Sequence, residues 1–139
     1  MGDFSVQSHV IDDIDTFMVA LHGENRFTTS RANAEKLVQR FQATPYRGLI
    51  IDYRDSVLGH QMSEYRQIAE TFANGFPAGQ IVAYVFDDSQ VAHIMLMTRT
   101  LAAQGFRVRA FSTPELARDW IANQLDANII AFDPAQKTG

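Results

Sequence analysis

Three side chains with catalytic potential follow an apolar stretch near the middle of the chain. Residues 48–53 read Gly-Leu-Ile-Ile-Asp-Tyr, and Asp55, Ser56 and His60 come soon after them. Serine, histidine and aspartate are the parts of a hydrolase triad, but the Gly-x-Ser-x-Gly turn that exposes such a serine is absent. A serine at a helix start can instead carry a phosphate on free N–H groups. We therefore interpret Asp55, Ser56 and His60 as a candidate phosphosite or partner-binding loop, and a hydrolase-like enzyme using Ser56 and His60 ranks third.

Carboxylates also gather where strands are expected to end. Several carboxylate oxygens together can hold a divalent cation, and the chain offers Asp52, Asp55, Asp87 and Asp88. Helix capping explains Asp88 or Ser89 more simply. The histidines stand at positions 9, 22, 60 and 93 with no pair at i, i+4, and the chain has no cysteine. We expect no metal and no cofactor.

Residues 91–101 predict a helix that is apolar around most of its circumference. Its sheet-facing stripe is expected to be Val91, Ile94, Met95, Thr98, Leu101 and Ala102, which leaves Leu96 and Met97 off that stripe. Methionine adapts to irregular or exchangeable partners. A dimer interface or an apolar ligand groove is one interpretation, and a fully covered core helix is the other. The candidate residues for the interface or groove are Met62, Met95, Leu96 and Met97.

Strand-like and helical patterns alternate along the chain. Strands are expected over 4–11, 16–22, 48–53, 80–86 and 106–111, with helices between and after the later ones. This order predicts an α/β fold: a five-stranded, mostly parallel sheet with four helices, whose first strand is an antiparallel edge. Ligands of such sheets bind beyond the carboxyl ends of the strands, here residues 52–60, 87–89 and 111–113.

The segment 105–121 predicts a strand that turns directly into a capped helix. Ser112 and Glu115 have the spacing of a capping box, and Pro114 suits a first turn. We expect one domain over residues 1–125 and a C-terminal tail over 126–139, with a short strand at 128–132 and frayed residues after it.

Composition narrows the class of protein. Of 139 residues, 46% are hydrophobic and 20% charged, as in ordinary globular proteins. The net charge is −4 and the arginines are scattered, which argues against nucleic acid as a partner. No apolar run has the length of a membrane span. We expect a cytoplasmic protein.

The element order, the Gly-Leu-Ile-Ile-Asp strand and the ending Arg-Val-Arg-Ala-Phe-Ser-Thr-Pro-Glu-Leu-Ala-Arg-Asp-Trp-Ile together resemble the SpoIIAA-like family of the STAS-domain superfamily. The resemblance covers residues 4–124 and implies a small regulatory or binding module without enzymatic activity. Anti-sigma-factor antagonists of that superfamily carry a phosphorylated serine in an Asp-Ser-Ser-Gly context. Here Asp55 and Ser56 match its first two positions, while Val57 replaces the serine that is modified.

The sequence thus predicts a non-enzymatic regulatory or binding module. Its contacts are expected at loop 52–60 and at the third helix, with another protein or a second copy of the chain. The alternative is a carrier of an apolar small molecule or lipid, since related folds of the superfamily are associated with lipid binding.

Overall fold

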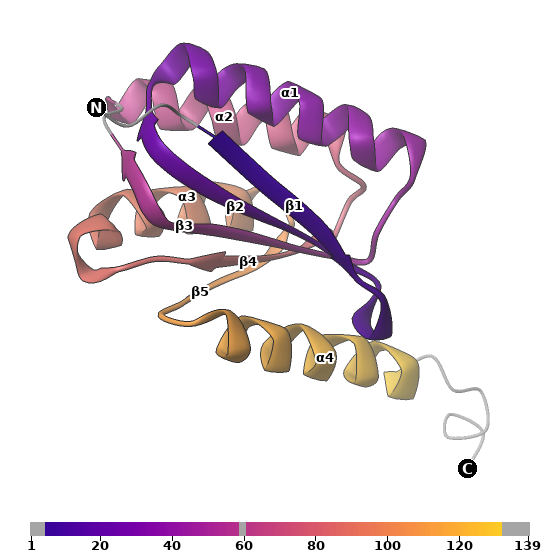
Figure 1. Cartoon of the computed structure of the whole chain (residues 1–139). Coiled ribbons are helices and arrows are strands. Elements are labelled where there is room, and N and C mark those ends of the chain that lie inside the picture. The colour runs from indigo at the N-terminus through magenta and orange to yellow at the C-terminus, as the bar shows by residue number, and fades with distance from the viewer. Residues whose placement is uncertain (1–4, 59–60, 132–139) are drawn as a thin grey trace.

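Five strands form one sheet in the computed structural model, which describes residues 5–58 and 61–131. Their order across the sheet follows the chain, from an antiparallel β1–β2 pair to the parallel strands β3, β4 and β5 (Figure 1). This arrangement confirms the predicted sheet and its antiparallel edge. The strands are β1 Ser5–Ile11, β2 Thr16–Asn25, β3 Gly48–Leu58, β4 Ile81–Val85 and β5 Arg107–Phe111.

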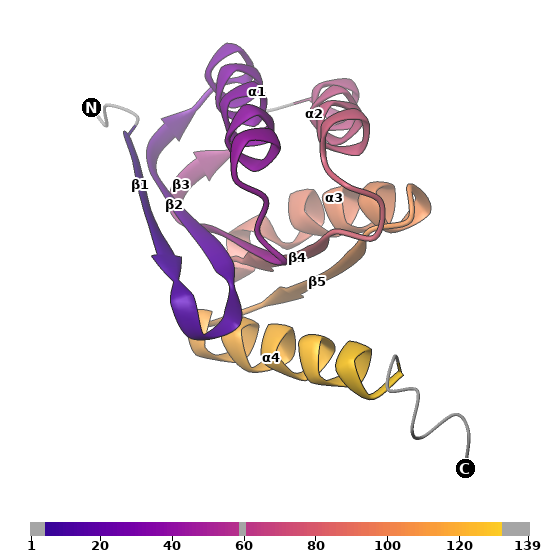
Figure 2. The same cartoon turned by 90° about the vertical axis from the view of Figure 1, so that its right-hand side faces the viewer.

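Four α-helices cover the two faces of the sheet unequally. The first three, α1 Phe27–Ala43, α2 Met62–Gly75 and α3 Val91–Ala103, lie on one face, and α4 Pro114–Ala131 crosses the other (Figure 2). The three β-α-β crossovers all step in the same direction across the sheet, so connections of one hand place their helices together. Two short 3-10 turns, η1 Asp12–Ile14 and η2 Asp88–Gln90, complete the element order.

Each face of the sheet carries its own apolar core. Beneath α1, α2 and α3 the buried side chains include Phe41, Leu49 and Tyr84, whereas Ile50 and Ile121 belong to the core beneath α4. All five residues of β4 are buried, as expected for a central strand covered on both faces. In the described part of the chain, no helix combines the length and apolarity needed to cross a membrane.

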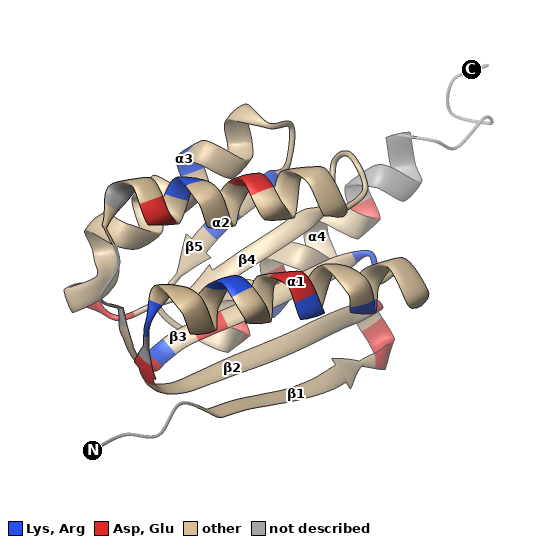
Figure 3. Ribbon diagram, turned by 90° about the horizontal axis from the view of Figure 1, so that it is seen from above, with Lys and Arg blue, Asp and Glu red and all other residues tan. Residues whose placement is uncertain are grey.

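Charges on the helices over the larger core are mixed in sign. Figure 3 shows basic and acidic residues interspersed along α1 and α2. The turn between β1 and β2 is acidic, with Asp12, Asp13 and Asp15 in four positions. Asp15 adopts the left-handed region at φ 44°, which aspartate tolerates better than most residues, and its carbonyl accepts from the Arg47 and Gly48 amides.

The C-terminal helix differs from its sequence prediction at both ends. Residues 128–131 are helical, so the short strand expected there is wrong; Phe132 and the residues after it lie outside the described chain. At the other end Thr113, rather than Ser112, caps the helix, because its Oγ1 accepts from the Leu116 amide at 3.2 Å. Pro114 does occupy the first helical position.

The third helix is rotated from the expected orientation. Ile94, Met97 and Leu101 are buried, whereas Val91 and Met95 are 44% and 48% exposed. The physical reason precedes the helix: the Gln90 side chain is buried against β3, and positions 94, 97 and 101 follow it on the same side at helical spacing. The predicted stripe with Val91 and Met95 against the sheet is therefore wrong.

Candidate functional site

The third strand continues beyond the central sheet at its carboxyl end. Its pairing with β4 ends at Asp52, and from there it pairs only with β2. Between the pairs Ala20–Asp52 and His22–Asp55 the register shifts, because two residues of β3 lie opposite one of β2. Residues 52–58 are therefore strand, and the prediction of a loop over this part of 52–60 is wrong.

An ion pair stabilises this irregular step. Asp52 is 7% exposed and accepts from the Arg54 backbone amide at 3.0 Å. Its carboxylate also accepts hydrogen bonds from the Arg54 guanidinium, with Nη2–Oδ2 at 2.8 Å and Nε–Oδ1 at 3.0 Å. The hydrogen bond to Asp52 raises the pKa of Arg54, so the guanidinium keeps its positive charge.

Gln90 fixes the end of β3 to the start of α3. Its Nε2 donates to the backbone carbonyls of Tyr53 and Ser56, both at 2.6 Å. Its Oε1 accepts from the Asp87 amide at 3.2 Å, while Asp87 Oδ1 accepts from the Ser89 amide at 2.9 Å. Asp87 is thus the capping residue here, in place of the expected Asp88 or Ser89.

A hollow of about 420 Å³ opens between these two segments. Residues 54–57 of β3 line one side, and Asp87, Ser89, Gln90 and His93 line the other; we call these residues the carboxyl-edge surface. Val57 is 64% exposed there. The Asp55 side chain is 72% exposed and lies 3.5 Å from His22 Nδ1, measured from Oδ2. The surface is mostly polar, with one prominent apolar side chain.

Of the candidate triad and phosphosite residues, the structure describes Asp55 and Ser56, and the two differ in exposure. Ser56 is only 5% exposed, lies inside β3 rather than at a helix start, and its Oγ has no hydrogen-bond partner among the described residues. Asp55 points toward His22. His60 lies outside the described residues. Ser56 as a phosphosite stays a prediction, and its burial means that a kinase could reach it only if the end of β3 opened.

The carboxylates that were weighed as an alternative cation site do not cluster within residues 5–58 and 61–131. No group of three potential ligands is positioned for a metal ion there. The Asp52 carboxylate is paired with the Arg54 guanidinium, and the Asp87 carboxylate caps the start of η2, so both already have partners.

Three of the four candidate interface residues lie on the third helix, and they differ in how far they are buried. Met97 is 2% exposed and belongs to the core, and Leu96 is half-buried against that core. Met95 is exposed. Met62 is the first residue of α2, and its side chain lies outside the described part. Met97 therefore does not line an exposed groove with Met95 on α3, and a role for Met62 stays a prediction.

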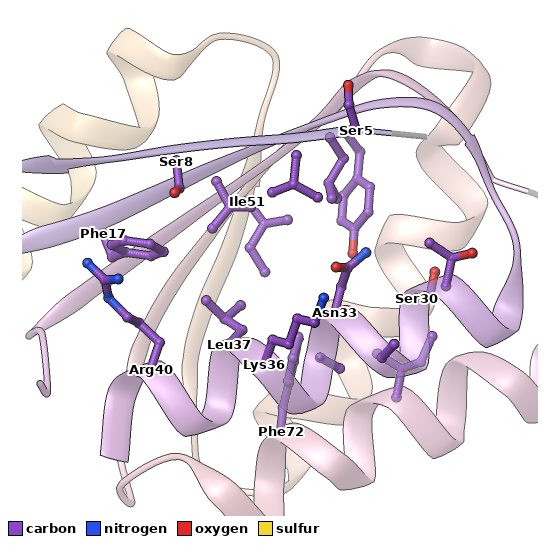
Figure 4. Close-up of a pocket in the computed structure, with 18 residues that line it drawn as sticks. Ser5, Ser8, Phe17, Ser30, Asn33, Lys36, Leu37, Arg40, Ile51 and Phe72 are labelled. Atoms are coloured by element: carbon purple, nitrogen blue, oxygen red, sulfur yellow. The ribbon is translucent and has the colours of Figure 1, made fainter. Parts of the chain in front are cut away.

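Sequence reasoning missed a second and larger hollow, of about 550 Å³, between α1 and the edge of the sheet. We call it the α1–β1 groove. Figure 4 shows α1 along it, with Arg40 and Phe17 near one end and Ser30 toward the other. One signal in the sequence points to it: Lys36 and Arg40 stand four residues apart beside Leu37, so cations border an apolar helix face.

Comparison with known proteins supports the fold. No protein-family model and no curated protein matches the sequence. Among solved structures, the chain is similar to the crystal structure of an anti-sigma factor antagonist from Mycobacterium paratuberculosis, with a TM-score of 0.59 and 15% sequence identity. The match covers 85% of this chain and 95% of that one. The chain therefore has the fold of an anti-sigma factor antagonist, which confirms the predicted STAS/SpoIIAA-like α/β fold.

Proposed function

We propose that this protein is a small, non-enzymatic regulatory module that binds a protein partner through the carboxyl-edge surface. The observation that carries the proposal is the end of β3, which projects beyond β4 and presents Val57 with 64% of its surface exposed. Charged side chains of Arg54 and Asp55 flank this valine. An apolar centre with a polar rim is the usual composition of a protein–protein contact.

The rigidity of this surface supports the same function. The carbonyls of Tyr53 and Ser56 are held by Gln90, and the Arg54 side chain is held by Asp52. A surface that is already ordered loses little conformational freedom when a partner binds. The similar solved structure is by its name that of a regulatory protein, an anti-sigma factor antagonist, which favours a protein partner here as well.

The hydrolase alternative lacks this support. A nucleophilic serine must present its Oγ to substrate and to a base. Ser56 Oγ is buried, and Asp55 lies beside His22 rather than orienting a base on Ser56. The carrier alternative gains no support at the third helix, where Met97 fills the core instead of lining a groove.

Site-specific photocrosslinking in cells tests the proposal. A photoreactive residue at position 57 should give a discrete adduct, while the same residue at Gln39, exposed on α1, should not. The adduct mass separates a second copy of the chain from a different protein. Asp55→Lys should abolish the adduct without lowering the unfolding temperature. The proposal is wrong if positions 57 and 39 give the same adducts, or if Asp55→Lys has no effect on the one at 57.

A further inference from the structure

Strand β1 forms one edge of the sheet and is open to solvent along most of its length. In the described part of the chain it pairs only with β2, and Figure 2 shows it as the outermost strand. Residues 5–10 are all exposed. An edge strand presents backbone N–H and C=O groups that have no partner within the sheet, so a further strand can add to it.

The two edges of the sheet differ in their protection against such an addition. At the other edge, β5 has five residues, and the exposed side chains of Arg107 and Arg109 place charge along it. Charged side chains and short length are features by which edge strands avoid a partner. β1 has seven residues, none of which is lysine, arginine, aspartate, glutamate or proline, and its pairing with β2 runs from Ser5 to Ile11 without a bulge. The open edge of the sheet is therefore β1.

The sequence of β1 is complementary to itself when two copies run antiparallel about Ser8. In that register Ser8 lies opposite Ser8 of the second copy, and all seven residues have a residue opposite them. Val6 then lies opposite the second copy's Val10, and Gln7 opposite its His9. Side chains directly opposite each other in an antiparallel pair have Cβ atoms about 4.5–5.5 Å apart, so they interact.

The properties of these side chains favour the register about Ser8. Val6 and Val10 are 41% and 36% exposed, and the two valine pairs would remove this apolar surface from water. Centring the pair on Gln7 or on His9 instead would set valine opposite serine and leave two residues of each strand unpaired. The chain has a net charge of −4, but β1 carries no charge when its histidine is neutral, so no like charges face each other along the strand.

We propose that two copies of this chain associate through their β1 strands, antiparallel about Ser8, and join their sheets into one. Backbone hydrogen bonds give the affinity of such a strand addition, and a seven-residue antiparallel pair forms about six to eight of them. A two-fold contact at β1 uses the open edge of both copies, so the assembly closes as a dimer. The inference goes beyond the proposed function, since β1 shares no residue with the carboxyl-edge surface.

Analytical ultracentrifugation of charge variants tests the occupant and the register. We expect the unmodified chain to dimerise with a dissociation constant on the order of 10 µM, because the contact is short. Ser8→Lys and Ser8→Glu each set like charges opposite one another and should weaken the dimer by at least about tenfold, whereas an equimolar mixture of the two should dimerise. Gln39→Lys, the same change on the exposed face of α1, is the matched control and should dimerise like the unmodified chain.

Single cysteines give a second measurement of the register, because the chain contains no cysteine. With a short bifunctional thiol reagent, Ser8→Cys should form a covalent dimer. Val6→Cys mixed with Val10→Cys should do the same, and either of them alone should not, since the two equivalent positions are roughly 13 Å apart along the strands. Circular dichroism checks that each variant is folded.

Three results would overturn the proposal. The first is an unmodified chain that stays monomeric up to about 1 mM, a concentration far above the expected dissociation constant. The second is a Ser8→Lys variant that dimerises as well as the unmodified chain does. The third is a mixture of folded Ser8→Lys and Ser8→Glu that stays monomeric. The proposed function is scored separately, because crosslinking from position 57 should be the same in Ser8→Lys as in the unmodified chain.

Discussion

The carboxyl-edge surface and the α1–β1 groove are two hollows of the same domain that differ in how their walls are held. Hydrogen bonds fix the first: Gln90 binds two carbonyls of β3, and Asp52 binds Arg54. Apolar packing contributes most to the second, where α1 rests on the central strands and leaves β1 exposed. A surface fixed by directional bonds suits recognition of a defined partner surface.

Tyr53 lines the α1–β1 groove and is hydrogen-bonded to a residue of the carboxyl-edge surface. Its carbonyl accepts from Gln90 at the carboxyl-edge surface, while its side chain lines the α1–β1 groove and stacks on Tyr84 with ring centres 5.7 Å apart. A variant that removes the Tyr53 ring would change the α1–β1 groove and leave the backbone carbonyl that Gln90 binds. Changes at residues that line only one hollow should affect that hollow alone.

The largest effect is expected from Gln90→Leu. It leaves the carbonyls of Tyr53 and Ser56 and the Asp87 amide without their partner, which should lower the free energy of unfolding by about 3–4 kcal/mol. Gln80→Leu is the matched control, because Gln80 is also buried and donates to the carbonyls of Tyr46 and Arg47 at the opposite end of the sheet. Chemical denaturation measures both losses. Only Gln90→Leu should also abolish crosslinking from position 57. If Gln80→Leu abolished crosslinking as well, the effect would come from general destabilisation and not from the end of β3.

Ser56→Asp should have the next largest effect. A carboxylate at this buried position has no partner, so we expect a loss of about 2–3 kcal/mol in the free energy of unfolding. Ser56→Ala, which removes only an unpaired hydroxyl, should change it by less than about 1 kcal/mol. A neutral Ser56→Asp variant would mean that the end of β3 opens easily, and it would make phosphorylation of Ser56 sterically feasible.

Alkaline pH should destabilise the larger core, which contains Tyr84 and against which Tyr53 packs. Burial raises the pKa of Tyr53 and Tyr84 above the ordinary value near 10, so the folded protein keeps both phenols neutral where the unfolded chain ionises. The stabilisation is complete below pH 10. Above it the unfolding free energy should fall by about 1.4 kcal/mol per pH unit for each tyrosine. Tyr53→Phe should roughly halve this slope in denaturation curves between pH 10 and 11, and an unchanged slope would contradict the assignment.

The order and type of the elements were predictable because they depend on local patterns. The continuous apolar runs at 48–53 and 80–86 identified β3 and β4, and the alternation of strands and helices identified the fold class. These signals require no knowledge of distant contacts. The helical residues 128–131 are the exception, since the apolar Ile129 and Ile130 suit a strand as well as a helix.

Most of the candidate site depends on contacts between distant residues. Arg54 and Asp55 are polar and indicated a loop, yet they are strand because Asp52 binds Arg54 and because Gln90, 37 residues from Tyr53, holds the segment in place. The same Gln90 contact sets the rotation of α3 and buries Met97. The α1–β1 groove depends on how far α1 extends over β1, which no single segment specifies.

The smallest effect on stability should come from two exposed valines, one in each region. Val57 is 64% exposed and Val6, at the groove, is 41% exposed, so changing either to serine should alter the unfolding free energy by no more than about 0.5 kcal/mol. Their binding effects should differ completely. Val57→Ser should weaken the adduct formed by a photoreactive residue at position 89, which lines the same hollow, whereas Val6→Ser should leave that adduct unchanged, because position 6 lies outside this hollow. If Val6→Ser weakened the adduct as much as Val57→Ser does, the two hollows would form one functional site rather than two.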